Sequence, residues 1–284
     1  MVRGVLSKDE VGLLNQGIDA QAELNVRSGK LRNTRNNSRM SAPGNRKDVG
    51  NFMNWPKYGA AFRKLLCHPG VVPHLNALCG PGYRLDHAPL MLVQEPDSEG
   101  FMLHGGPLSG ERFNSELQYR SVNGRLWNTL VAMSVQLVDA PATSGGFCVV
   151  RGSHKSNFPL PPGWEHGDDE EFFKEHVHQP NTKAGDVIFF SEATVHGAVP
   201  WVAQHQRRVM LYRFSPATVA YGRAWLDNFG LDEDSLAACT PAERAVLQPP
   251  FADRFILPYT RSQPSPSLPT SCPCPKVGPR AFDR

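Results

Sequence analysis

The chain of 284 residues lacks any apolar run of about 18 residues, which is roughly the length that a helix needs to cross a bilayer. Its start, MVRGVLSKDE, also lacks the apolar stretch of a secretory signal. We therefore expect neither membrane insertion nor export. The expected location is cytoplasmic, with no membrane partner.

Cysteine is sparse, and no CxxC pair occurs. The six cysteines are too few for a disulfide scaffold in a chain of this length, and no second pair completes a zinc site. A disulfide-rich secreted protein is thereby excluded.

The chain also lacks a strong excess of either charge. It has 30 Lys and Arg against 27 Asp and Glu, a net charge of +3, whereas phosphate binding needs a basic face. Nucleic acid is therefore not the expected partner. One basic segment, from Arg27 to Lys47, holds seven Lys or Arg and no acid, and its Asn, Ser and Gly content favours a solvated loop.

Hydrophobic residues make up 40% of the chain, which is enough to build a folded core. Residues 7–10 (SKDE) form a capping box ahead of apolar positions at helical spacing, so a helix is expected there. Two further helices are expected, over 55–67 and 71–78.

From residue 83 onward, short apolar runs alternate with Gly and Pro, which predicts strands of a sandwich or barrel. These runs are 90–93, 130–138, 147–150, 186–190 and 209–214. We divide the chain into an N-terminal helix and basic loop (1–50), a β-domain (51–259) and a disordered proline-rich tail (260–284). The acidic and His-rich segment at 157–180 is expected to be an inserted loop or short helix facing solvent.

Three residues in or beside predicted strands have the chemistry of an iron site. His104 and His196 lie 92 residues apart, and Arg207 follows 11 residues after His196. A facial-triad iron site needs two neutral imidazoles and a carboxylate, with open positions for a keto acid and dioxygen. An Arg on a neighbouring strand can bind the far carboxylate of the keto acid through two parallel hydrogen bonds.

Three stretches in this order resemble the phytanoyl-CoA dioxygenase family of iron(II) and 2-oxoglutarate-dependent oxygenases. They are GGFCVVRGSHKSNFP (145–159), AGDVIFFSEATVHG (184–197) and RRVMLYRFSP (207–216). The resemblance implies a mainly β fold with peripheral α-helices, a double-stranded β-helix of the jelly-roll, cupin-like class. It also implies iron(II), 2-oxoglutarate and dioxygen as cofactors, and a small-molecule substrate that is hydroxylated at a C–H bond while 2-oxoglutarate is decarboxylated to succinate.

Carried over position by position, the resemblance assigns His104 and His196 as iron ligands and Arg207 as the 2-oxoglutarate anchor. Arg208 is the alternative anchor, because a register shift of one residue turns every side chain of a strand to the other face. Ser134 and Gln136 lie two apart on one expected strand and are expected to point into the pocket near the keto acid.

The chain departs from the family pattern at one position, because it reads His104-Gly105-Gly106 where the family has His-x-Asp. Three interpretations stay open. In the first, a carboxylate from elsewhere or a water completes the coordination and the enzyme is still a hydroxylase. In the second, a halide such as chloride occupies the position beside Gly106, as in related iron halogenases. In the third, the fold persists as a non-catalytic binding protein. The candidate carboxylates are Glu192, Glu111, Glu116 and Asp86.

Overall fold

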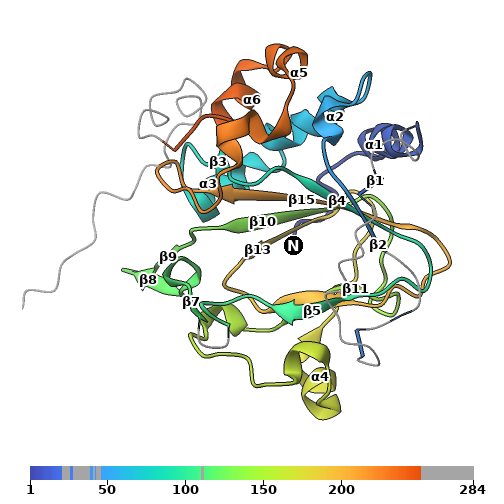
Figure 1. The fold of residues 1–284 in the computed structure, drawn as a ribbon, viewed down its shortest axis with the longest axis vertical. Coiled ribbons are helices and arrows are strands. Elements are labelled where there is room, and N and C mark those ends of the chain that lie inside the picture. Colours follow the sequence, from blue (N-terminus) through green and yellow to red (C-terminus); the bar gives the residue numbers. More distant parts are fainter. Residues whose placement is uncertain (21–25, 28–38, 41, 43–45, 110–111, 251–284) are drawn as a thin grey trace, which may run out of the picture.

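The computed structural model describes residues 1–20, 26–27, 39–40, 42, 46–109 and 112–250. The expected tail at 260–284, most of the basic segment and Glu111 lie outside these residues. Within the described part, two antiparallel sheets face each other (Figure 1). This is the arrangement expected of a jelly roll.

The larger sheet holds seven strands among the described residues. It includes β2, which precedes residue 51 in the chain and pairs with β4. In spatial order the strands are β1 (Val26–Arg27), β2 (Arg46–Val49), β4 (Leu90–Gln94), β15 (Arg207–Ser215), β10 (Val131–Gln136) and β13 (Val187–Ser191), and β3 (Arg84–Leu85) pairs with the end of β15.

The smaller sheet holds four strands among the described residues, and two short hairpins stand apart from it (Figure 1). In spatial order its strands are β12 (Val177–His178), β11 (Gly146–Val150), β14 (His196–Val199) and β5 (Phe101–His104). The hairpins pair β6 (Leu108–Ser109) with β7 (Arg112–Phe113), and β8 (Arg120–Val122) with β9 (Arg125–Trp127).

Helices cover the outer faces of both sheets. In Figure 1 most of them lie over the larger sheet, and α4 alone among the labelled helices lies below the smaller one. The α-helices are α1 (Lys8–Ala20), α2 (Gly59–Lys64), α3 (Val72–Cys79), α4 (Glu170–His176), α5 (Glu233–Ala237) and α6 (Pro241–Val246), and the 3₁₀ helices are η1 (Phe52–Asn54), η2 (Leu65–Cys67), η3 (Ser115–Leu117), η4 (Ser153–Lys155), η5 (Trp164–His166) and η6 (Ala224–Gly230). No helix among the described residues has the length and hydrophobicity to traverse a bilayer.

Most of the expected elements are present. The capping box at α1 forms as expected, because the Glu10 backbone N–H donates to Ser7 Oγ and the Ser7 N–H donates to the Glu10 carboxylate. The five expected strands correspond to β4, β10, β11, β13 and β15. The helix expected over 55–67 is shorter, because it begins only at Gly59 and tightens into a 3₁₀ turn at Leu65.

Strand β15 separates the hydrophobic core from the space between the sheets. Met210, Tyr212 and Phe214 are buried against the helices, and the Tyr212 hydroxyl donates to the backbone oxygen of Phe62. The alternate residues of the strand face the smaller sheet instead, because successive side chains of a strand point to opposite faces. This alternation places charged residues inside the molecule.

Candidate metal centre and cofactor cavity

A cavity of about 220 Å³ lies between the two sheets. Its walls combine aliphatic and aromatic side chains with a few charged ones, which is typical of small-molecule sites. The lining residues are Arg46, Asp48, Leu90, Leu92, Gln94, Phe101, His104, Ser134, Phe147, Phe190, His196, Gly197, Ala198, Arg207, Val209, Leu211 and Arg213.

Two imidazoles meet at one end of this cavity. His104 ends β5 and His196 begins β14, and the two residues are register partners in the smaller sheet. Their ring centroids lie 4.2 Å apart. The ring centroid of Phe101 lies 4.8 Å from that of His104, and the ring centroid of Phe190 lies 4.6 Å from that of His196. The two imidazoles therefore have apolar neighbours.

Backbone carbonyls fix the tautomer of both imidazoles. His104 Nδ1 lies 3.0 Å from the oxygen of Met102, and His196 Nδ1 lies 2.8 Å from the oxygen of Thr194. A carbonyl oxygen can only accept, so each Nδ1 carries the proton and donates it. Each Nε2 therefore keeps its lone pair, which is the arrangement found in most metal-bound histidines.

Glu192 brings a carboxylate to the same place. It follows β13 by one residue, and its Oε2 lies 3.7 Å from Nε2 of His196. One ligand atom each from His104, Glu192 and His196 lie within 4.8 Å of one another. Two imidazoles and a carboxylate on one side of a cavity match the donor set of a facial triad.

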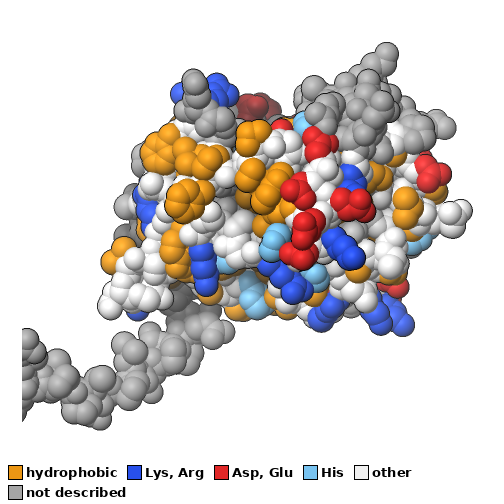
Figure 2. Space-filling model, turned by 90° about the horizontal axis from the view of Figure 1, so that it is seen from below, with side chains coloured by type: hydrophobic (Ala, Val, Ile, Leu, Met, Phe, Trp, Pro, Cys, Tyr) orange, Lys and Arg blue, Asp and Glu red, His pale blue; other side chains and the backbone are white. Residues whose placement is uncertain are grey.

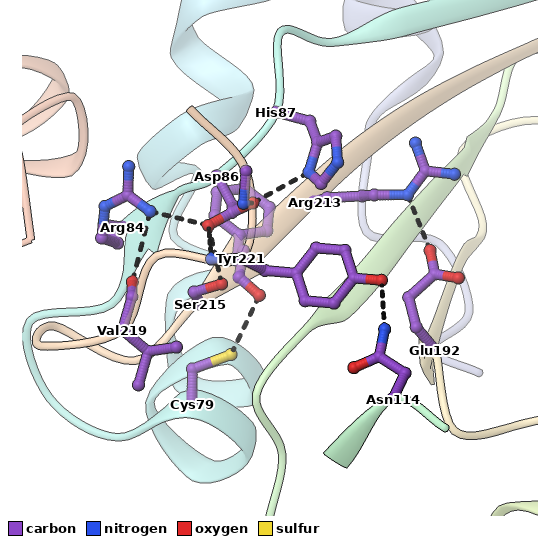
Figure 3. A network of polar contacts seen from close by, with 12 residues as sticks. Cys79, Arg84, Asp86, His87, Asn114, Glu192, Arg213, Ser215, Val219 and Tyr221 are labelled. Carbon is purple, nitrogen blue, oxygen red and sulfur yellow. Dashed lines mark hydrogen bonds and ion pairs between the residues drawn. The ribbon is translucent and has the colours of Figure 1, made fainter. Parts of the chain in front are cut away.

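Arg213 holds the other oxygen of this carboxylate. Its Nε donates to Glu192 Oε1 at 2.6 Å (Figure 3). Arg213 and Arg207 lie six residues apart on β15, so both face the cavity. Sequence reasoning missed Arg213, although this even spacing from Arg207 along one strand was a usable signal.

The two glycines after His104 allow the Glu192 turn to pack closely against β5. A Cβ on Gly105 would lie 2.2 Å from the backbone oxygen of Thr194, and Gly105 has a φ of +113°. Gly106 has a φ of +83°, and its N–H donates to the backbone oxygen of Glu192 at 3.0 Å. The missing Asp is thus accompanied by close contact with the segment that brings Glu192 to the site.

Burial sets the protonation of the three groups. It lowers the pKa of His196 to about 4, with a further contribution from His104, and it also lowers the pKa of His104. Burial acts to raise the pKa of Glu192, but its electrostatic interactions with His196 and Arg213, together with the hydrogen bond from Arg213, outweigh it and leave this pKa below its usual value. At neutral pH the group therefore presents neutral imidazoles and an ionised carboxylate, the forms that bind a divalent metal.

Arg207 also lines the cavity, six residues from Arg213 along β15, and is almost fully buried. One of its terminal nitrogens donates to Oε1 of Gln94, and the Gln94 amide in turn donates to the backbone oxygen of Glu99. Burial lowers the pKa of Arg207 to about 10, so the guanidinium stays charged at neutral pH. Gly146 makes room for it, because a Cβ there would lie 2.9 Å from Arg207 Nε.

The Arg207 Nε atom is a buried donor with no hydrogen-bond partner among the described residues. Buried charged donors without partners are rare and costly. An anionic ligand in the cavity would satisfy this donor.

Arg208, the alternative anchor, does not reach the cavity. Its side chain donates to Asp19 at 2.5 Å and to the side chains of Asn15 and Gln206, so it ties β15 to α1. The physical reason is the alternation of side chains along the strand, which places neighbouring residues on opposite faces.

Ser134 lines the cavity, whereas Gln136 supports it. Both are buried, and the Gln136 amide donates to the Ser134 hydroxyl at 2.8 Å. A hydroxyl that accepts this bond still has its own proton to donate. Ser134 can therefore offer a donor to a ligand, and Gln136 acts through Ser134.

The other candidate carboxylates lie elsewhere or outside the described part. Asp86 is buried in its own network, where it accepts from Arg84, from Ser215 and from the N–H groups of Tyr221 and Gly222 (Figure 3). Glu116 is exposed and accepts from Thr129. Glu111 lies outside the described residues. Glu192 is thus the candidate that the fold brings to the histidines.

A family comparison agrees with this geometry. The model of the phytanoyl-CoA dioxygenase family matches residues 1–209, which is well over half of the chain. The chain belongs to this family. Iron(II), 2-oxoglutarate and dioxygen, the cofactors expected from the sequence, are those of the family. No curated protein shows significant similarity to the chain.

Solved structures of similar fold include proteins that bind a metal and 2-oxoglutarate. HygX from Streptomyces hygroscopicus, with nickel, 2-oxoglutarate and hygromycin B bound, is 20% identical, with a TM-score of 0.59 over 78% of this chain and 84% of that one. The 2-oxoglutarate-dependent epimerase SnoN from nogalamycin biosynthesis is 22% identical, with a TM-score of 0.54 over 80% of this chain and 82% of that one. The mainly β, jelly-roll fold expected from the sequence is confirmed.

Proposed function

We propose that this protein is an iron(II) and 2-oxoglutarate-dependent hydroxylase whose metal is held by His104, His196 and Glu192. The observation that carries the proposal is the convergence of these three donors, within 4.8 Å, beside a cavity that His104 and His196 line together with the buried Arg207. When bound, the metal and 2-oxoglutarate supply the oxidation of a C–H bond by dioxygen, with succinate and carbon dioxide as co-products.

The residues of the chain would bind and orient the reactants. His104 and His196 would offer Nε2, while the carbonyls of Met102 and Thr194 keep each Nδ1 protonated. Arg207 would bind the distal carboxylate of 2-oxoglutarate, and Ser134 would donate to the same molecule. The apolar walls, including Phe101, Phe147 and Phe190, would exclude water from the reacting carbon.

Hydroxylation is favoured over halogenation by the position of Glu192. A halogenase needs a coordination position that a halide can occupy. Here a carboxylate that Arg213 orients already faces the histidines. The bound hygromycin B in HygX supports a small organic molecule as the substrate class.

The experiment adds iron(II) and 2-oxoglutarate to the purified protein without oxygen and records the visible charge-transfer band, then measures succinate after oxygen is admitted. We expect the band and succinate formation without any need for chloride. Glu192→Ala should lose both, whereas Glu116→Ala should keep both. A wild-type protein without the band would overturn the proposal in favour of a binding protein, and succinate formed only with chloride would favour a halogenase.

A second variant tests the origin of the carboxylate. A Cβ on Gly106 would meet only the Ala193 backbone oxygen, at 3.7 Å, so the first side-chain atom of an Asp fits there, although the φ of +83° strains it. Gly106→Asp combined with Glu192→Ala should regain part of the band, because it restores the family's usual carboxylate.

A further inference from the structure

Exposed hydrophobic side chains are concentrated on one small part of the molecule. Among the described residues, ten large hydrophobic side chains are exposed, and five of them lie on the two hairpins and the nearby turn at 151–158. We call residues 108–109, 112–127 and 151–158 the hairpin surface. Its exposed hydrophobic side chains are Phe113 (59%), Val122 (72%), Leu126 (49%), Trp127 (45%) and Phe158 (81%).

The two parts of this surface are joined. The backbone N–H of Tyr119 donates to the side-chain oxygen of Asn157 at 3.0 Å, and the ring of Tyr119 contacts that of His154. In Figure 1 the labels β7, β8 and β9 lie together at one side of the molecule. Figure 2 shows hydrophobic side chains gathered toward that side, whereas the acidic ones on this face lie nearer its middle.

Cations accompany the hydrophobic side chains. The sequence places five Lys or Arg in 108–127 and 151–158, against two acids, Glu111 and Glu116. Arg120 pairs with Trp127 across the β8–β9 hairpin and Val122 pairs with Arg125, and paired residues point to the same face. The basic residues are Arg112, Arg120, Arg125, Arg151 and Lys155.

We propose that the hairpin surface binds the surface of an anionic lipid bilayer. Aromatic and aliphatic side chains at hairpin tips can enter the boundary between headgroups and acyl chains, while arginines beside them contact lipid phosphates. The charge of the surface is complementary to anionic lipid. This peripheral contact needs no spanning helix, and it revises the expectation from sequence that a membrane takes no part.

The hairpin surface lies next to the proposed metal centre in the chain. The first hairpin begins at Leu108, two residues after Gly106, so the surface continues directly from the strand that carries His104. Bilayer contact would therefore be made by the segment adjoining the proposed metal centre. The proposal itself rests on exposure and charge alone and does not depend on the metal.

The test is co-sedimentation of the full chain with vesicles of phosphatidylcholine, with and without phosphatidylserine. We expect binding to the anionic vesicles that weakens as salt is raised. Phe113→Ser and Trp127→Ser should each weaken it about tenfold, and Arg125→Gln should weaken it about fivefold. Leu226→Ser is the matched control, because Leu226 is 65% exposed outside the hairpin surface, and it should bind as the wild type does.

The fluorescence of Trp127 can show whether this side chain enters the bilayer. Vesicles with brominated acyl chains should quench part of the protein fluorescence, and Trp127→Phe should abolish this quenching while it preserves binding. An absence of anionic-vesicle binding by the folded wild-type protein would overturn the proposal. So would a concentration-dependent dimer that Trp127→Ser disrupts in the absence of vesicle binding, because the surface would then join two copies of the chain.

Discussion

Arg213 donates from Nε to one oxygen of Glu192 at 2.6 Å, and the other oxygen of the same carboxylate lies 3.7 Å from Nε2 of His196. One strand residue thus orients a carboxylate that comes from the turn after another strand. This relationship shows how a chain that has Gly106 in place of an aspartate brings together three side chains that could hold a metal ion.

Removal of the carboxylate should weaken metal binding strongly. Loss of a group that merely supports a ligand costs roughly 10- to 100-fold in affinity, so loss of the ligand in Glu192→Ala should cost more than about 100-fold. Titration with cobalt(II), followed by visible absorption, measures this. Equal cobalt affinity in Glu192→Ala and wild type would show that Glu192 is not a ligand.

We expect Arg213 to act on the metal through Glu192. Arg213→Met should lower cobalt affinity by roughly 10- to 100-fold, because the freed carboxylate loses its fixed orientation. Arg213→Lys should recover part of the loss, since an ammonium supplies the charge without the planar geometry of the guanidinium. If Arg213→Met binds cobalt as tightly as wild type, the ion pair serves only stability.

The two glycines after His104 should differ sharply in their tolerance of a side chain. Gly106→Ala has space and should lose only about 1 kcal/mol of unfolding free energy, from its positive φ. Gly105→Ala would place Cβ against the Thr194 oxygen, and should lose about 3 kcal/mol or more. Urea unfolding of both variants measures the difference, and equal losses would contradict the close packing of the Glu192 turn.

Arg207 and Arg208, which are neighbours on β15, allow a matched test of which arginine binds 2-oxoglutarate. Arg207→Met should weaken 2-oxoglutarate binding by roughly 10- to 100-fold, because a buried charged hydrogen-bond donor is lost. Arg208→Met should leave that affinity unchanged, because Arg208 faces α1 and binds Asp19. Calorimetric titration of 2-oxoglutarate into the cobalt-loaded protein gives both values, and the reverse ranking would identify Arg208 as the anchor.

The Asp86 network should make the free energy of unfolding depend on pH in the acidic range. Burial acts to raise the pKa of Asp86, but His87 and the N–H groups of Gly222 and Tyr221 outweigh it and leave the pKa below the ordinary 3.8. The ionised carboxylate therefore stabilises the fold above about pH 4, and this stabilisation is lost as pH falls through the lowered pKa.

Asp86→Asn should accordingly reduce the unfolding free energy at neutral pH by about 3–5 kcal/mol, because it leaves buried Arg84 without its ion pair. Below pH 4, the unfolding free energy of the variant should also fall less steeply than that of the wild type. Chemical unfolding over a pH series measures both effects. Glu175→Gln, at an exposed position on α4, is the control and should follow the wild-type profile.

The sequence predicted much of the fold because its strands carry strong local signals. Runs such as 186–190 and 209–214 are apolar and bounded by turn residues, so they identify β13 and β15 without tertiary information. The predicted length of the helix over 55–67 was wrong, because helix propensity alone does not show that the residues before Gly59 form turns.

The site was only partly predictable, for a physical reason. His196 and Arg207 lie in stretches that resemble the family, and the same resemblance assigns His104. Glu192 could be named but not ranked, because its approach depends on the contact between Gly105 and Thr194, two residues far apart in the sequence that meet only when β5 pairs with β14. The roles of these residues stay predictions until the experiments above are done.

The spacing on β15 constrains how this chain can change. Arg207 and Arg213 both line one cavity because an even number of residues, six along one continuous strand, separates them. Insertion of a single residue between them would turn one of the two toward the helices and disconnect it from the cavity. An insertion before Arg207 would leave the spacing of the two arginines unchanged, so we expect it to affect the cavity less than an insertion within the strand.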